Sequence, residues 1–100
     1  MNNKILCVDD EESILKGFRL HLRKGFDLFT AISGEDGLRV FDEEGGFAVV
    51  LSDMRMPGID GAAMLSAIKE RNADVVTMLL TGHADFESAM SAVNDGNVFR

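Results

Sequence analysis

The chain has 100 residues, 46% of them hydrophobic and 27% charged, which is the composition of one globular domain and excludes a disordered, collagen-like or coiled-coil segment. Seventeen acidic residues against ten basic ones give a net charge of −7, so direct binding to nucleic acid or to a membrane surface is not expected. One cysteine cannot form an internal disulfide, and no apolar run reaches the roughly 18 residues of a membrane span. We therefore expect a cytoplasmic domain.

Four short apolar runs predict strands. In chain order they are Ile5–Val8, Leu28–Ile32, Ala48–Leu51 and Val75–Leu80. The first, third and fourth are nearly continuous and lack polar alternation, which is typical of strands buried on both faces of a parallel sheet.

Segments with helical periodicity follow each run. Their apolar stripes are Ile14, Leu15, Phe18 and Leu22; Leu38 and Phe41; Met64, Leu65 and Ile68; and Phe86, Ala89, Met90 and Val93. Ser33 is placed to cap the second helix. Strand and helix alternate four times, and right-handed crossovers then predict an α/β fold, a doubly wound parallel sheet with helices on both faces.

Polar residues follow three of the predicted strands. Asp9 and Asp10 come after the first, Asp53 after the third and Thr81 after the fourth. Because ligands of such sheets bind outside the carboxyl ends of the strands, we expect these side chains to meet at one edge. Asp9 and Asp10 are also placed to cap the first helix, and that role is compatible with ligand binding.

Carboxylates brought together in this way repel one another, by about 3 kcal/mol for a pair about 5 Å apart at an effective dielectric constant of about 20. A hard divalent cation removes this repulsion, and Mg²⁺ binds through one or two carboxylates while keeping other positions for water or phosphate. Asp9, Asp10 and Asp53 are therefore a predicted Mg²⁺ site. One of the three carboxylates is placed to accept a phosphoryl group as an aspartyl phosphate.

Three segments then show a resemblance to a known family. ILCVDDE at 5–11, LSDMRMPGIDG at 51–61 and LTGH at 80–83 resemble the receiver domain of two-component response regulators, in order and with the family's spacing. The stretch D-x-x-M-P-x-x-D-G that begins at Asp53 is the most specific part of the match.

The resemblance implies that Asp53 is the phosphoacceptor, that Thr81 is the switch hydroxyl, and that the backbone carbonyl of Arg55 joins Asp9, Asp10 and Asp53 as a Mg²⁺ ligand. It implies a flavodoxin-like sheet of order 2-1-3-4-5. The implied partners are a sensor histidine kinase or histidine phosphotransfer protein as phosphoryl donor, and an output domain or partner protein reached through the fourth-helix face. The role implied is that of a regulatory domain rather than an enzyme, with Mg²⁺-dependent self-phosphorylation and autodephosphorylation.

The family also has a Lys at the end of a fifth strand, which this chain does not show, and Phe99 stands too early to be the family's switch aromatic. We therefore expect residues 1–100 to form a receiver domain that is incomplete at its C-terminus. The fifth strand and fifth helix are then absent, and the fourth strand is left as an open apolar edge.

Two other functions are compatible with parts of the sequence. The first is a Mg²⁺-dependent phosphohydrolase of the haloacid dehalogenase type, but such an enzyme needs a second acid two residues after its nucleophile, and Arg55 at that position argues against it. A non-phosphorylated pairing module, acting by homodimerisation or strand exchange through the fourth strand, is the main alternative.

Overall fold

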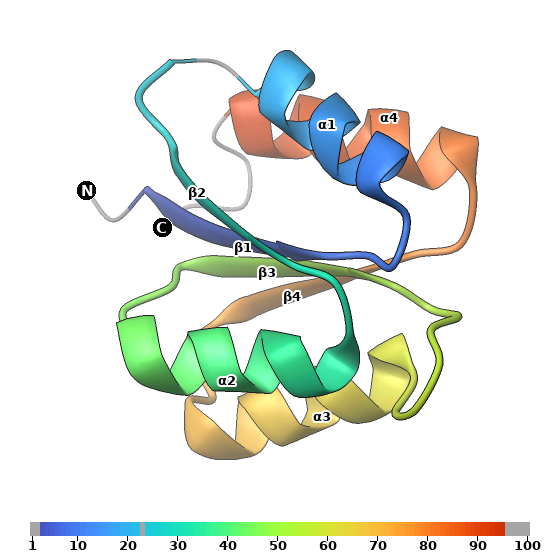
Figure 1. Ribbon diagram of the computed structural model, residues 1–100. Coiled ribbons are helices and arrows are strands. Elements are labelled where there is room, and N and C mark those ends of the chain that lie inside the picture. Colours follow the sequence, from blue (N-terminus) through green and yellow to red (C-terminus); the bar gives the residue numbers. More distant parts are fainter. Residues whose placement is uncertain (1–2, 23, 96–100) are drawn as a thin grey trace.

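The computed structural model describes residues 3–22 and 24–95, without the side chains of residues 83 and 84, and consists of alternating strands and helices (Figure 1). The strands are β1 (Lys4–Val8), β2 (Asp27–Ala31), β3 (Val49–Asp53) and β4 (Val76–Leu80). The helices are α1 (Glu12–His21), α2 (Gly34–Glu44), α3 (Gly61–Arg71) and α4 (His83–Asn94). All strand pairs are parallel and the sheet order is β2-β1-β3-β4, which confirms the predicted fold class. Residues 97–100, where the fifth strand of the family would begin, and Phe99 among them, lie outside the described residues.

Each face of the sheet has its own hydrophobic cluster, and this explains the continuous apolar runs of the two central strands. Leu6, Val8 and Val50 face α2 and α3. Ile5, Cys7 and Leu51 face α1 and α4, and Figure 1 shows the two helix layers on opposite sides of the sheet. Since neighbouring side chains of a strand point to opposite faces, consecutive apolar residues are needed where β1 and β3 are covered on both sides, at Ile5–Val8 and Val49–Leu51.

The predicted helix stripes lie against the sheet. Fully buried members are Leu15, Phe18, Phe41, Met64, Leu65, Ile68, Ala89, Met90 and Val93. The side chains of Ile14, Leu22, Leu38 and Phe86 are partly buried against the same clusters. Ser33 caps α2 as expected, because its Oγ accepts a hydrogen bond of 3.0 Å from the Asp36 N–H.

Two strand predictions need correction. The second run was expected to extend to Ile32, but β2 ends at Ala31, and the Ile32 N–H donates to the Asp36 carboxylate at the start of α2 (3.3 Å). Ile32 is 61% exposed as a result. The fourth run was expected to be buried on both faces, but Val76, Thr77 and Met78 of β4 are only half-buried and Leu79 is 38% exposed. Within the described chain β4 pairs only with β3 and is an outer strand of the sheet, as expected.

Helix α4 lies on the same face of the sheet as α1 (Figure 1). The rings of Phe18 and Phe86 are 5.0 Å apart, and the Asn94 side chain donates to the backbone carbonyl of His21 (2.9 Å). A right-handed crossover from β4 to a strand beyond it would need its helix on the opposite face, beside α3. In this structure α4 therefore covers the apolar α1 side of the sheet and is not placed as a crossover helix.

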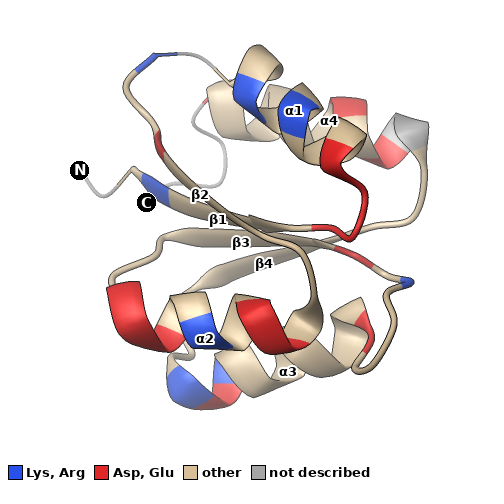
Figure 2. Cartoon of the chain, viewed as in Figure 1, with Lys and Arg blue, Asp and Glu red and all other residues tan. Residues whose placement is uncertain are grey.

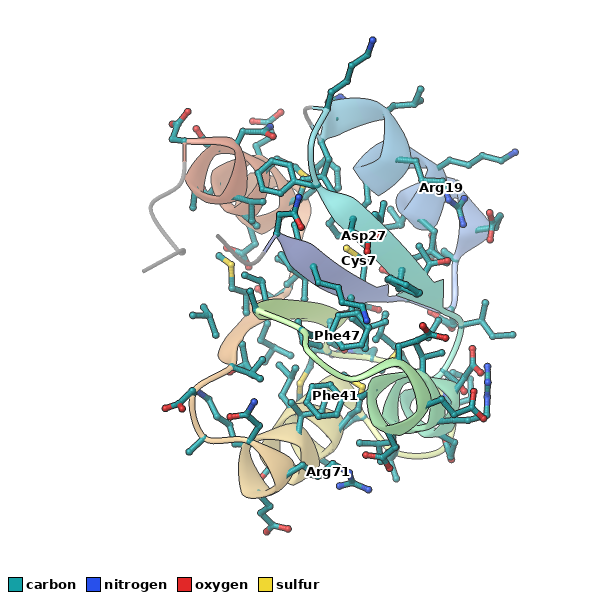
Figure 3. The ribbon with its side chains drawn as sticks, turned by 90° about the vertical axis from the view of Figure 1, so that its left-hand side faces the viewer. Cys7, Arg19, Asp27, Phe41, Phe47 and Arg71 are labelled. Carbon is teal, nitrogen blue, oxygen red and sulfur yellow. The ribbon has the colours of Figure 1, made fainter. Side chains whose placement is uncertain are left out.

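On the opposite face of the sheet, Lys4 at the start of β1 holds the end of α2. Its ammonium group donates to the carbonyls of Glu44 and Gly45 at the end of α2 (3.1 and 2.7 Å), where the helix dipole favours a cation. It also lies 5.0 Å from the centre of the Phe47 ring, which stacks on Phe41 below the sheet (Figure 3). These contacts hold α2 against β1, and β1 in turn leads into the acidic residues at its far end.

Helix α3 begins in direct contact with the end of β3. A Cβ atom on Gly61 would lie 2.0 Å from the backbone oxygen of Asp53, so only glycine permits this approach. Gly17 in α1 differs, because a Cβ there would make an ordinary contact of 3.4 Å with the Phe86 ring.

We expect Gly61→Ala to lower the free energy of unfolding by about 1–3 kcal/mol, because the new methyl group must displace the Asp53 backbone. Gly17→Ala is the matched control and should raise it by about 0.5–1 kcal/mol through its better helix propensity. Urea unfolding of both variants measures the difference. Equal effects of the two substitutions would contradict the close approach.

Candidate functional site

The register of the sheet brings Asp9 and Asp53 together. Val8 of β1 lies opposite Ser52 of β3, so the next residue on each strand is an aspartate at the carboxyl end of the sheet. The Asp9 N–H donates to the carbonyl of Ala31 (3.1 Å), which fixes the backbone of Asp9 against β2 as well. Figure 2 shows acidic segments following β1 and ending β3 at the same edge of the sheet.

Three carboxylates meet there as the sequence predicted. Asp9, Asp10 and Asp53 each offer a carboxylate oxygen, and these oxygens all lie within 4.8 Å of one another. Asp10 is exposed and Asp53 is half-buried, whereas Asp9 is only 5% exposed. The arrangement combines a buried acid with two more accessible ones in a small volume.

The surroundings of Asp9 disfavour its charge. The pKa of Asp9 is raised from 3.8 to about 6. Burial is the largest cause of this rise, a hydrogen bond from the Glu11 N–H (2.9 Å) opposes it, and the nearby charges of Asp53, Asp10 and Glu11 add to it. The hydrogen bond to Glu11 also shows that Asp9 accepts a backbone donor at the start of α1, while Glu11 itself makes no side-chain cap. Asp9 therefore accepts a hydrogen bond from the N-cap residue of α1, and its binding of a metal ion stays a prediction.

Thr81 follows β4 and lies at the rim of this acidic cluster. The Met54 N–H donates to the Leu80 carbonyl (3.3 Å), which continues the pairing of β3 and β4 up to the site. Thr81, Asp10 and Asp53 line one shallow pocket together with Glu11, Met54 and Arg55. The residue predicted to carry the switch hydroxyl thus lines the same pocket as the predicted phosphoacceptor.

Thr81 has a close partner that sequence reasoning missed. Its hydroxyl donates to Oδ2 of Asp85, and its backbone N–H donates to the same oxygen (3.0 Å). These two hydrogen bonds, first that of the hydroxyl and then that of the backbone, lower the pKa of Asp85. An acid four residues after a strand-end threonine, in the first turn of the next helix, is the signal that could have revealed the pair.

The loop between β3 and α3 carries Arg55. The Gly61 N–H closes this loop by donating to the Met54 carbonyl (2.9 Å), and Gly58 takes a φ of 82°, which favours glycine. The Arg55 side chain is exposed, two residues beyond Asp53. A role for its backbone carbonyl as a metal ligand stays a prediction.

A second pocket lies beside Asp9 and Asp53, between α1 and α4. Asp9 and Asp53 form part of its wall, and Ile14, Leu80 and Phe86 supply apolar surface between α1 and α4. Glu11 and Asp53 line both pockets.

Comparison with known proteins agrees with this geometry. A family model described as the response regulator receiver domain matches residues 5–98. The chain belongs to the response regulator receiver domain family. This receiver domain is 34% identical over 93 residues to the transcriptional regulatory protein GlrR of Escherichia coli K12, covering 92% of this chain and 21% of GlrR. It therefore spans about a fifth of GlrR, and 40% of the transcriptional regulatory protein PrrA of Mycobacterium bovis, to which it is 30% identical over 93% of this chain.

Solved structures show the same relationship. A response regulator receiver domain protein from Clostridium thermocellum is 38% identical with a TM-score of 0.73, over 93% of this chain and 75% of that one. A chain described as an adenylate cyclase from Rhodopirellula baltica is 37% identical with a TM-score of 0.77, over 100% of this chain and 74% of that one. None of the helices within residues 3–22 and 24–95 is long and apolar enough to cross a membrane.

The donor set of the receiver domain fits a hard divalent cation. All three clustered groups offer carboxylate oxygen, which is the ligand that Mg²⁺ prefers, and the low exposure and raised pKa of Asp9 show that the cluster carries unfavourable charge. A bound cation would relieve that charge.

Ionisation of Asp9 should make the metal-free domain less stable as the pH rises. Because the pKa of Asp9 is higher in the folded than in the unfolded chain, the folded state binds the proton more tightly, so this contribution is lost as the pH rises from about 4 to above 6. We expect Asp9→Asn to raise the free energy of unfolding at pH 7.5 by about 1–2 kcal/mol, allowing for solvent screening. At pH 4.5 the gain should be smaller.

Thermal unfolding in a chelating buffer at both pH values measures this effect. Asp27→Asn is the matched control, since Asp27 is an exposed aspartate at the start of β2, at the opposite end of the sheet. A loss of stability in Asp9→Asn at pH 7.5, or an equal gain in Asp27→Asn, would contradict the expectation.

Proposed function

We propose that Asp53 is the phosphoacceptor of this receiver domain and that a sensor histidine kinase or a histidine phosphotransfer protein is the donor. The observation that supports this most is the meeting of Asp53 with Asp9 and Asp10, whose carboxylate oxygens lie within 4.8 Å. An oxygen of Asp53 attacks the phosphorus of phosphohistidine and forms an acyl phosphate. The phosphorus–nitrogen bond breaks, and its electron pair stays on the imidazole.

Asp9, Asp10 and Asp53, with the backbone carbonyl of Arg55, are the groups that would hold Mg²⁺. When bound, the cation neutralises negative charge on the transferring phosphoryl group. The domain's own residues orient Asp53 through the strand pairing of β1, β3 and β4, and leave it open to a donor on one side. Attack of water on the acyl phosphate returns the carboxylate, which would be the autodephosphorylation expected of the family.

Phosphorylation would be read out through Thr81 and α4. Thr81 precedes α4 by two residues, and Phe86 of α4 packs on Phe18 of α1. A movement of Thr81 would therefore be transmitted to a helix that packs on α1. We place the surface recognised by an output domain or partner protein on α4. The net charge of −7 and the free Cys7, which is buried, favour a cytoplasmic domain that does not itself bind nucleic acid or membranes.

Incubation with acetyl phosphate and Mg²⁺, followed by intact-mass measurement, tests the acceptor. We expect the mass of one phosphoryl group on the parent chain and on Asp27→Asn, and none on Asp53→Asn. An adduct of equal yield on Asp53→Asn would show that another residue is the acceptor. A folded parent chain that takes no phosphoryl group would contradict the proposal.

A second candidate function, self-association without phosphorylation, is favoured by one observation. In the described part of the chain β4 is an outer strand of the sheet, and Leu79 on it is partly exposed. An apolar strand that pairs on one side only leaves an open edge, to which a strand of a second copy can add. Homodimerisation or strand exchange would both use this edge.

Sedimentation over a range of concentrations tests pairing at β4. We expect the parent chain to self-associate and Leu79→Lys to weaken association at least tenfold, because a charge on the edge opposes pairing. Leu20→Lys is the control, since Leu20 is 82% exposed on α1, away from this edge. A parent chain that stays monomeric at high concentration would exclude the pairing function.

A further inference from the structure

The hydroxyl of Thr81 already has an acceptor. It donates to Oδ2 of Asp85, which also accepts the Thr81 backbone N–H at 3.0 Å. Asp85 lies in the first turn of α4, where the helix dipole favours a carboxylate. Lowering of the Asp85 pKa by these two bonds agrees with an ionised acceptor.

A threonine hydroxyl has a single hydrogen to donate. As long as the Thr81 hydroxyl donates this hydrogen to Asp85, it cannot donate it to an oxygen atom at Asp53, although Thr81 lines the same pocket as Asp53. A phosphoryl group on Asp53 would bring anionic oxygens to this pocket and compete with Asp85 for the one hydrogen. The two acceptors exclude each other at any moment.

We infer that Asp85 is a positioning residue that retains the Thr81 hydroxyl in the unphosphorylated domain and sets how readily the domain switches. The inference rests on the proposed function of Asp53. It gives the switch a defined resting partner at the start of α4. When the hydroxyl turns from Asp85 to the phosphoryl group, the first turn of α4 would lose one of its two hydrogen bonds to Thr81 and keep only that of the backbone N–H.

A simpler possibility is that Asp85 only stabilises the start of α4. The N-cap residue Gly82 has no side chain that could cap the helix, so Asp85 is the acidic group that stabilises the first turn of α4. That role predicts a lower melting temperature when Asp85 is replaced, but no coupling between Asp85 and Thr81 in the binding of a phosphoryl mimic. The two roles are therefore separable by experiment.

The test is a double-mutant cycle on the affinity for beryllofluoride, which imitates a phosphoryl group on a carboxylate, in the presence of Mg²⁺. Asp85→Asn should bind it roughly three- to tenfold more tightly than the parent chain, because a neutral amide competes less well for the hydroxyl. Asp85→Ala should change affinity further in the same direction. In a Thr81→Val background the gain should disappear.

Glu87→Gln is the control for net charge, since Glu87 is an exposed acid on α4 and its replacement removes the same charge. Equal affinities of Asp85→Asn and Glu87→Gln, or a gain that persists in Thr81→Val, would overturn the inference while leaving the phosphoacceptor proposal intact. Absence of beryllofluoride binding in every variant, together with absence of a phosphoryl adduct, would overturn both.

Discussion

The close approach of three carboxylates, one of them buried, at the carboxyl ends of β1 and β3 is the constraint around which the functional part of this domain is built. Three carboxylate oxygens lie within 4.8 Å, and the acid that is least exposed, Asp9, has its pKa raised to about 6 mainly by burial. A fold would not keep such a cluster for stability alone, because removal of one charge would relieve it. The same cluster offers oxygen ligands for a divalent cation beside the carboxylate that we propose as the nucleophile.

The rest of the fold holds that cluster in place. Parallel pairing of Val8 with Ser52 sets Asp9 beside Asp53, and the absence of a side chain on Gly61 lets α3 start against the Asp53 backbone. The two hydrophobic clusters lock β1 and β3 from both faces, so the aspartates cannot separate without loss of core packing. Rigidity of the central strands thus opposes the electrostatic repulsion at their ends.

Much of this could be predicted from the sequence, because continuous apolar runs and helical stripes determine the order of elements, and strand ends of a parallel sheet meet at one edge. What could not be predicted depends on tertiary contacts. The side of the sheet covered by α4 is decided by the packing of Phe86 on Phe18, and the end of β2 by a hydrogen bond of Ile32 to Asp36. The pairing of Thr81 with Asp85, which their spacing of four residues could have suggested, depends on the path of the chain into α4.

The central claim is that the clustered charge makes the domain a cation site, and the melting temperature as a function of Mg²⁺ concentration tests it most directly. Our account predicts that Mg²⁺ raises the melting temperature of the parent chain with saturation. It also predicts that Asp10→Asn, which removes one accessible carboxylate, melts higher than the parent without Mg²⁺ and gains less from it. A parent melting temperature that does not respond to Mg²⁺, or an equal response in Asp10→Asn, would contradict the account.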